Sequence, residues 1–352
     1  MPSIHDVAAK AGVSTTTVSR TFRSPELLNS VTHQRVMEAA QQLGYRPRGR
    51  GRAKVRTASS APTGDTIGFQ FFADRPEDAL QSNAFYAPML VGAQAEAADL
   101  GLNLLVHTTN RHSLTKELPK MILDGAIAGM LLVGTGADAA TLSTFSRYVP
   151  RLVLLDQHDE TRRFESVLSD GFDGAYQATR YLLSLGHTRI AFFLAESATS
   201  TFRDRLNGYL AALFEAGITP EQELVVGGEY SDADEIREER LQALMRLPQP
   251  PTALLSPNDD YALTVMRAFR KKGVRIPEDI SLIGFDDISF AMHTDPPLTT
   301  VRVDKELMGR LGVRRLFARI QASEKPYPEP CGRYEVPVSL VIRESCRAIA
   351  SK

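Results

Sequence analysis

Apolar residues repeat with helical spacing in three short segments at the beginning of the chain. Residues at i, i+3, i+4 and i+7 share one face of a helix, so this spacing predicts three helices around a small core. The apolar positions are Ile4, Val7, Ala8 and Ala11, then Val18 and Phe22, then Val36, Ala39, Ala40 and Leu43. Ser3 followed by Asp6 is typical of a capping box, and Gly12 marks a tight turn after the first helix. Two helices crossing over such a turn indicate a helix-turn-helix, whose second helix enters the DNA major groove.

From Thr66 onward, apolar runs alternate with helical patterns. The expected buried strands are 67–72, 102–107, 129–133 and 152–155, followed by 189–194, 224–228, 252–255 and 280–284. The expected helices are near 85–100, 113–124, 138–147, 173–185, 203–216, 232–246 and 259–272. Strands that alternate with helices form parallel sheets covered on both faces. We therefore predict an α/β protein with an all-α N-terminal head and a two-lobed body of doubly wound parallel sheets.

The composition limits the class of protein. The 352 residues are 43% hydrophobic and 24% charged, which is typical of a globular protein of two or three domains. No apolar run is long enough for a membrane helix, and the N-terminus lacks a signal-peptide pattern. Two cysteines, Cys331 and Cys346, cannot form a disulfide framework. We expect a cytoplasmic protein with no membrane partner.

The net charge of −1 conceals an asymmetry. Residues 1–57 contain ten Lys or Arg and three Asp or Glu, a net charge of +7, whereas residues 58–352 contain 31 and 39, a net charge of −8. A basic head on an acidic body predicts a polyanionic partner at one end of the protein. A basic tail without structure is disfavoured, because the apolar residues of the head are periodic.

Residues 4–20, IHDVAAKAGVSTTTVSR, resemble the head of the LacI/GalR (lactose repressor/galactose repressor) family of transcriptional regulators. Residues 36–47 resemble the third helix and exit of that head. The resemblance implies that Thr15, Thr16 and Arg20 read bases, and that Ser14, Thr17 and Ser19 contact phosphates. Three successive threonines are poor helix formers, which argues against a purely structural surface helix.

The linker departs from this family. Family members have a short hinge helix with a leucine that enters the minor groove, whereas this chain reads Pro47-Arg48-Gly49-Arg50-Gly51. Two glycines disfavour a helix, and the segment resembles an AT-hook core without its last proline. Arg48 and Arg50 could lie in a narrow A·T minor groove, or the segment could be a basic tether that touches only phosphates. Both interpretations stay open.

The body also resembles this family, for example at 205–209 (RLNGY), 258–262 (NDDYA) and 276–287 (IPEDISLIGFDD). In the family this part resembles periplasmic sugar-binding proteins. The expected domains are a head at 1–46, a linker at 47–65 and an effector-binding and dimerisation domain at 66–352. Lobe one is expected at 66–157 plus 290–323, and lobe two at 163–288 plus 334–345.

The resemblance implies an effector site in the cleft between the lobes. Carried over by position, its residues are Phe85, Tyr86, Asp156, Arg205, Tyr230, Asn258 and Asp286. Carboxylates, a guanidinium and aromatic rings suit a polyol such as a sugar. Each residue also has a structural interpretation: Asp156 as a helix cap, Arg205 in a surface ion pair and Tyr230 in the core. Asp170 and Asp287 are interpreted as caps, and His187 as a structural surface histidine.

Two other functions compete with this prediction. Gly134-Thr135-Gly136 follows a strand and precedes a helix, and Asp156 lies 20 residues after Gly136, as in a dinucleotide-binding motif of a nicotinamide-dependent oxidoreductase. The basic head gives such an enzyme no advantage. A sugar-binding transport protein is disfavoured by the same head and by the N-terminus. No hydrolase, kinase or metal motif is present in the sequence.

The sequence therefore predicts a DNA-binding transcriptional regulator rather than an enzyme. We expect a repressor that binds a near-palindromic operator in double-stranded DNA as a homodimer, under the control of a sugar or sugar derivative. No catalytic residue, metal or cofactor is expected.

Overall fold

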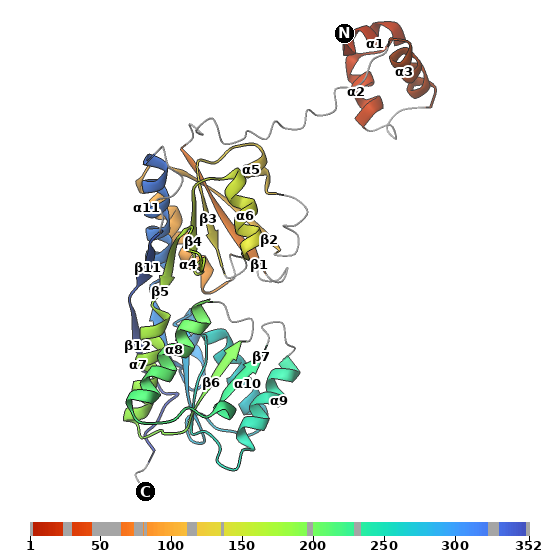
Figure 1. The fold of residues 1–352 in the computed structure, drawn as a ribbon. Coiled ribbons are helices and arrows are strands. Elements are labelled where there is room, and N and C mark those ends of the chain that lie inside the picture. Colours follow the sequence, from red (N-terminus) through yellow and green to blue (C-terminus); the bar gives the residue numbers. More distant parts are fainter. Residues whose placement is uncertain are drawn as a thin grey trace. The chain divides into compact units, whose positions relative to one another are not determined.

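The structure is a computed structural model that describes residues 3–23, 30–43, 65–73, 80, 83–110, 118–134, 137–195, 200–228, 234–322 and 331–349. The chain divides into two compact units, Met1–Val55 and Arg56–Lys352, which are considered separately (Figure 1). Residues 47–64 of the expected linker lie outside the described residues. Within the described part, no helix is both long and apolar enough to cross a membrane.

The first unit contains three helices. They are α1 (Ile4–Ala11), α2 (Thr15–Arg23) and α3 (Ser30–Gln42), as their apolar spacing predicts. The capping box is confirmed, because Ser3 accepts from the Asp6 amide while the Asp6 side chain accepts from the Ser3 amide. Gly12 ends α1 with a φ of 63°, a conformation that favours glycine. The buried core consists of Val7, Ala8, Ala11, Val18, Val36, Ala39 and Ala40.

The second unit contains two six-stranded sheets, one in each lobe. The sheet of lobe one has the order β11-β5-β4-β3-β1-β2, and all its pairs are parallel. Its strands are β1 (Thr66–Ala73), β2 (Asn103–Asn110), β3 (Met130–Val133), β4 (Leu152–Leu155), β5 (Glu165–Ser169) and β11 (Arg333–Val336). The helices of this lobe are α4 (Tyr86–Asp99), α5 (Lys120–Leu123), α6 (Ala139–Tyr148) and α11 (Lys305–Gln321).

The sheet of lobe two has the order β12-β10-β9-β8-β6-β7. Its strands are β6 (Ile190–Ala195), β7 (Val225–Gly228), β8 (Ala253–Leu255), β9 (Ser281–Asp286), β10 (Thr299–Val303) and β12 (Val338–Val341). The edge strand β12 runs antiparallel to β10, so this sheet is not wholly parallel. The helical segments are α7 (Gly171–Ser184), α8 (Ser200–Glu215), η4 (Gln222–Leu224), α9 (Asp234–Met245), α10 (Asp259–Lys271) and η5 (Ser289–His293).

The chain passes between the sheets at positions different from those expected. β5 pairs with β4 in lobe one, although 163–288 was assigned to lobe two. β10 pairs with β9 in lobe two, although 290–323 was assigned to lobe one, and β11 belongs to lobe one. The sequences ESVLS and TTVRV contain too many polar residues to be recognised as buried strands, so the boundaries 157, 163, 290 and 334 were wrong at these strands. The helix α11 was likewise not predicted.

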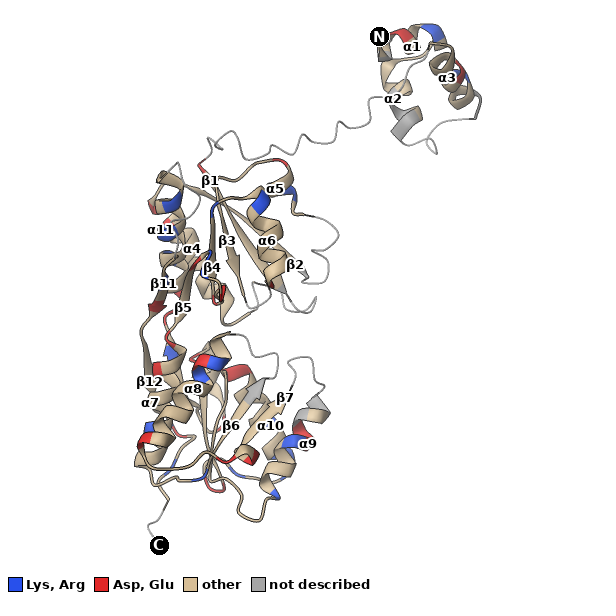
Figure 2. Cartoon of the chain, viewed as in Figure 1, with Lys and Arg blue, Asp and Glu red and all other residues tan. Residues whose placement is uncertain are grey.

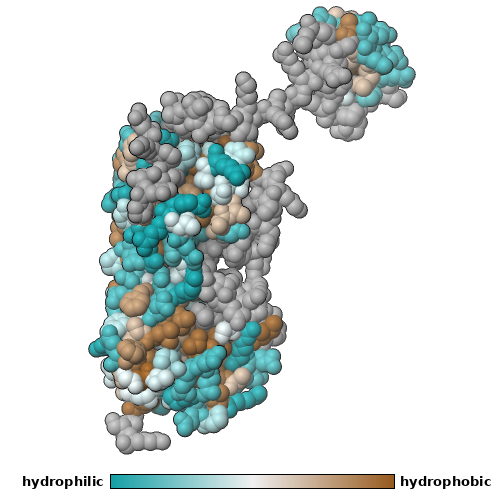
Figure 3. All heavy atoms as spheres, in the orientation of Figure 1, coloured by the Kyte–Doolittle hydropathy of each residue, from teal (hydrophilic) through white to brown (hydrophobic). Residues whose placement is uncertain are grey.

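The distribution of charged residues shows which elements lie inside the second unit and which lie at its surface. Figure 2 shows Lys, Arg, Asp and Glu mainly on helices and loops, whereas β3, β4 and β6 carry none. Such strands are buried on both faces, as parallel strands usually are. Figure 3 shows apolar surface over α7 and α8 in lobe two, where Phe172 and Phe214 are exposed.

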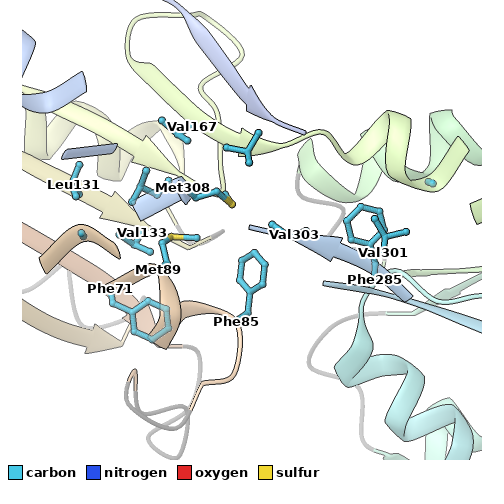
Figure 4. Packing of buried hydrophobic residues seen from close by; sticks show 14 of the residues in the cluster. Phe71, Phe85, Met89, Leu131, Val133, Val167, Phe285, Val301, Val303 and Met308 are labelled. Carbon is cyan, nitrogen blue, oxygen red and sulfur yellow. The ribbon is translucent and has the colours of Figure 1, made fainter. Parts of the chain in front are cut away.

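One hydrophobic cluster continues through both lobes at the place where they join. It includes Phe71, Phe85, Met89, Val133, Phe285, Val301, Val303 and Met308 (Figure 4). On its lobe-one side, α4 and α11 pack so closely that a Cβ atom at Gly92 would lie 2.0 Å from the Glu306 carbonyl oxygen. Glycine is therefore required there, and the close contact fixes the start of α11 beside α4.

Candidate functional site

The first turn of α2 presents the hydroxyl groups expected at DNA. The Ser14 hydroxyl accepts a hydrogen bond from the Thr17 amide at 3.1 Å and lies 2.9 Å from the Thr17 hydroxyl. Both side chains thus stabilise the start of the helix. Thr16 is exposed and Thr15 is half-buried, and the first turn contains no acidic residue. An exposed helix N-terminus without acidic groups can accept a phosphate.

The remaining residues expected at DNA are only partly described. Ser19 and Arg20 belong to α2, but their side chains lie outside the described part of the structure. Arg20 follows Thr16 by four residues, so the two share a face of the helix. Arg48 and Arg50 lie entirely outside the described residues. Their roles stay predictions.

Two aspartates at the carboxyl ends of parallel strands define the expected effector site. Asp156 follows β4 with a φ of 60°, and Asp286 ends β9 with a φ of 110°. Asp287 also has a positive φ, 50°. A non-glycine residue in such a conformation costs about 1–3 kcal/mol and persists only where its surroundings hold it, often at functional sites. Ligands of α/β proteins also bind at this end of the strands.

Asp156 belongs to the lobe-one side of the site. Its Oδ2 accepts a hydrogen bond from the Tyr86 hydroxyl at 2.7 Å. Phe85 packs edge-on against Tyr86, with ring centroids 5.0 Å apart, and Asn83 accepts from both of their amides. Burial raises the pKa of the Asp156 carboxyl to about 6, although the Tyr86 hydroxyl opposes the shift.

Arg205 and Asp286 form the lobe-two side. Arg205 lies on α8, is only 3% exposed, and donates from Nη2 to Asp286 Oδ1 at 3.1 Å. It also donates to the Pro257 carbonyl oxygen, and its guanidinium lies 3.7 Å from the centre of the Phe285 ring. Burial raises the pKa of Asp286 to about 7, against the attraction of Arg205. The interpretation of Arg205 as a surface ion pair is therefore wrong.

Several polar atoms at these strand ends are buried without a hydrogen-bond partner in the described part of the chain. They are Asp156 Oδ1, Arg205 Nε, Gln157 Nε2 and Ser169 Oγ. An unsatisfied buried polar group costs about 1–3 kcal/mol, so this set indicates a place for a polar ligand. Gln157 and Ser169 were not predicted from the sequence. Ser169 ends β5, a strand that was itself missed, and Gln157 could have been found only as the neighbour of Asp156.

Asn258 and Asp259 support the site from the start of α10. The Asn258 side chain accepts from the Tyr261 amide at 2.9 Å, so it caps the helix, and its amide nitrogen can still donate to a ligand. Asp259 is fully buried and accepts from the Thr300 hydroxyl at 2.6 Å and the Ile288 amide at 2.9 Å. Burial, followed by the nearby Asp286, raises the pKa of Asp259 to about 8. Tyr230 lies outside the described residues.

Three structural interpretations have different outcomes. Asp170 caps α7, as expected, by accepting from the Asp173 amide at 2.9 Å. Asp287 is not a cap, because its carboxylate accepts from Arg302 at 2.7 Å and Arg343 at 2.6 Å. His187 is structural but not a surface residue: it is 1% exposed and its ring lies 2.9 Å from the Thr252 hydroxyl.

The dinucleotide-binding interpretation meets an electrostatic obstacle. The helix after Gly134 is α6, and Asp138 caps its N-terminus by accepting from the Thr141 amide at 2.7 Å. A carboxylate in this position occupies the helix N-terminus and repels a pyrophosphate. Gly136 lies outside the described residues. Among the residues that are described, no group of three or more His, Cys, Asp or Glu side chains could hold a metal ion.

A hollow of about 630 Å³ opens between the lobes beside Lys305. Its lobe-one wall comes from α4 and the residues before it, and its lobe-two wall from η5 and β10. The lining residues are Asn83, Ala84, Ala87, Pro88, Asp287, Ser289, Phe290, Arg302, Val303, Asp304, Lys305 and Glu306. Phe290, which lines this hollow, is 60% exposed, and Val91 on α4 and Met292 on η5 are 52% and 56% exposed, which is high for such apolar side chains.

Comparisons with known proteins match both parts of the chain. Residues 3–48 match the family model of bacterial regulatory proteins of the lacI family, and residues 179–346 match the periplasmic binding protein-like domain. The HTH-type transcriptional repressor PurR of Photobacterium profundum is 28% identical over 350 residues, which cover 99% of each chain. A solved complex of the transcriptional regulator CelR with cellobiose is 27% identical with a TM-score of 0.69, covering 98% of this chain and 100% of that one. The lac repressor dimer bound to operator and the anti-inducer ONPF is 26% identical with a TM-score of 0.64, covering 99% of both chains.

Proposed function

Because the chain belongs to the lacI family of bacterial regulatory proteins, and is thus a DNA-binding repressor that responds to a small effector, we propose that this effector is a polyol. The polyol, a sugar or sugar derivative, binds between the lobes at Asp156, Arg205 and Asp286. The observation that carries this proposal is the pair of buried, unpartnered atoms Asp156 Oδ1 and Arg205 Nε, identified within the described residues.

The two atoms need opposite partners. Asp156 Oδ1 is an acceptor when ionised, whereas Arg205 Nε is a donor. A hydroxyl group both donates and accepts, so neighbouring hydroxyls of one small molecule satisfy both atoms at once. Phe85 and Tyr86 supply aromatic surface for the apolar face of a sugar ring. An effector with its own carboxylate would meet Asp156 and Asp286, which disfavours that class by charge repulsion.

A ligand screen by thermal shift tests this proposal. The full-length protein is heated with D-ribose, cellobiose, D-glucose, a nucleoside such as cytidine, and gluconate as an acidic relative of glucose. A ligand present at 100 times its Kd stabilises the folded state by about 2.7 kcal/mol and raises the melting temperature. At least one neutral polyol is expected to raise it, and gluconate is not. Stabilisation by acidic ligands alone would overturn the proposed class.

We infer that the head binds operator DNA through α2. Thr15, Thr16 and Arg20 are proposed to read bases, while Ser14, Thr17 and Ser19 hold phosphates. The exposed Thr16, the absence of acidic groups from the first turn and the net charge of +7 in residues 1–57 support this assignment. The Ser14 oxygen can keep accepting from the Thr17 amide while its O–H donates to a phosphate.

We propose that the protein binds its operator as a homodimer and that the dimer face includes Val91, Phe290 and Met292. These three apolar side chains are more than half exposed in the single chain. Exposed apolar side chains that lie together often mark a surface that a partner protein buries. The three side chains come from α4 and η5, so one face would join both lobes of one protomer to a second copy. In a two-fold dimer the same patch of both subunits forms the interface, so the patch of each copy would be buried by the patch of the other.

We assign no enzymatic role, metal or cofactor to this protein. The oxidoreductase interpretation lacks support, because Asp138 occupies the helix start that a pyrophosphate would need. Transport is not proposed either, since residues 3–48 match a DNA-binding regulator. We infer a cytoplasmic location from the operator DNA that the protein must reach.

A further inference from the structure

Lys305 begins α11, at a position where a cation is electrostatically disfavoured. A helix N-terminus carries partial positive charge, so acidic side chains stabilise it and basic ones do not. Asp304 caps the helix by accepting from the Leu307 amide at 2.9 Å, and Lys305 follows directly. The Lys305 side chain is half-buried, so it does not simply extend into solvent. Its presence indicates a role outside the helix itself.

The Lys305 ammonium turns back toward the end of the second sheet. It donates to the carbonyl oxygen of Asp286, and to those of Asp287 and Val303 at 3.2 Å each. An ammonium has three N–H donors, so these three carbonyls use its full capacity. Two of them belong to the consecutive residues with positive φ at the effector site.

The same ammonium also contacts lobe one. It lies 6.0 Å from the centre of the Phe85 ring, within the range of a cation–π interaction. Phe85 immediately precedes α4, and Figure 4 shows it with Val303 at the junction of the two lobes. Lys305 therefore contacts the turn that bears Asp286 in lobe two and the aromatic wall of the site in lobe one.

Other residues hold different parts of this turn. Arg302 and Arg343 bind the side chain of Asp287, and Asp259 accepts from the Ile288 amide. Among the described residues, the ammonium donates only to main-chain carbonyls, and two of these belong to the residues with positive φ angles. Removing the ammonium would leave these carbonyls without their charged donor, so that the turn would be held only by the side-chain contacts and would open more often.

We propose that Lys305 is a positioning residue, which fixes the Asp286–Asp287 turn so that Asp286 faces the effector and which ties this turn to lobe one. That Asp286 faces an effector rests on the proposed function above, whereas the role of Lys305 in holding the turn does not. Lys305 acts through Asp286 and need not touch the effector itself.

Hydrogen–deuterium exchange of the ligand-free full chain tests this proposal. The variants are K305M, which keeps the length of the side chain but has no donor, and K305R, which keeps a charged donor. K120M is the matched control, because Lys120 is an exposed lysine in lobe one whose side chain is 89% exposed. The reporters are the Asp287 and Ile288 amides in the turn, with the Leu282 amide, bonded to the Ser345 carbonyl at 2.8 Å, as the reference in β9.

In K305M the turn amides are expected to exchange roughly tenfold faster or more, since a charged hydrogen bond is lost, while Leu282 exchanges as in the unmodified protein. K305R should restore most of the protection, and K120M should change nothing. Unchanged protection of the turn in K305M, or an equal loss at Leu282, would overturn the proposal. If K305M does not fold, K305Q, which retains neutral donors, is measured against the same expectations. Because no ligand is used, a negative polyol screen leaves this result unaffected, and a failure here leaves the screen unaffected.

Discussion

The guanidinium of Arg205 donates to the carboxylate of Asp286 at 3.1 Å, and both side chains are buried although 81 positions separate them in the sequence. Both also interact with Asp156: the charge of Arg205 opposes the rise in the pKa of Asp156 that burial causes, and the charge of Asp156 adds to the rise in the pKa of Asp286. A buried pair of this kind leaves little room for substitution. It also gives the effector site both a charged donor and a charged acceptor.

Asp286→Asn is expected to weaken effector binding about 10- to 100-fold and to leave operator binding unchanged. The amide keeps the shape of the carboxylate but loses a charged acceptor, and hydrogen bonds to charged groups contribute about 1.5–3 kcal/mol. Calorimetry with the polyol found by the screen, together with a DNA shift assay, measures both properties. Asp124→Asn, at an exposed position, is the control. Effector affinity equal to that of the unmodified protein would remove Asp286 from the site.

The contribution of Asp156 and Asp286 to the stability of the ligand-free protein should fall as the pH rises from about 5 to 7.5. Burial raises the pKa of Asp156 to about 6 and of Asp286 to about 7, well above their ordinary value of 3.8. A group whose pKa is raised in the folded state stabilises that state below its unfolded pKa, and this contribution is lost as the pH passes the folded pKa. Urea unfolding at several pH values measures the slope. The slope should be smaller in Asp156→Asn, and an identical slope would mean that Asp156 titrates normally.

Phe290→Asp with Met292→Asp should convert the dimer to a monomer at micromolar concentration. Two charges would have to be buried on each side of the proposed face, and unpaired buried charges are strongly unfavourable. Sedimentation velocity measures the oligomeric state, and circular dichroism verifies the fold. Phe214→Asp serves as the control, because Phe214 is 80% exposed and lies on α8. A dimer that survives the double substitution would place the interface elsewhere.

Arg20→Ala should lower affinity for the operator by about 1–3 kcal/mol while sparing binding to random DNA, as expected for a lost base contact. Its helix, α2, is the element whose first turn presents Thr16. Binding titrations at fixed salt concentration compare the two DNA types. An equal loss on both would make Arg20 a phosphate contact.

Arg48→Ala with Arg50→Ala distinguishes the two interpretations of the linker. If the arginines lie in the minor groove, binding to A·T-rich operators should weaken more than binding to G·C-rich ones, because the narrow A·T groove has the more negative potential. Replacement of both by lysine should lose most of this preference while keeping the charge. Equal weakening on both DNA types, with a salt slope reduced by about one per removed charge, would support a phosphate tether.

The elements with local signals could be predicted from the sequence. The three helices of the head follow from apolar spacing and from caps such as Ser3 and Gly12, which involve residues no more than a few positions apart. The central strands, such as MLLV and LVLL, are apolar throughout because parallel strands are buried on both faces. The family resemblance added Asp156 and Asp286, which lie at the carboxyl ends of β4 and β9, and Arg205, which α8 brings to Asp286.

The lobe to which a strand belongs and the contacts of a polar side chain depend on partners far away in the sequence, so they became known from the folded structure. β5 and β10 lack a continuous apolar run, so their lobes were set by pairing with β4 and β9, which no local pattern encodes. Ser169 ends β5 opposite Val336 of β11, and the Lys305 ammonium reaches carbonyls 18 and 19 residues earlier in the chain. Hydrogen bonds and burial are properties of groups that meet in space, so a polar residue acquires its role only when the chain has folded around it.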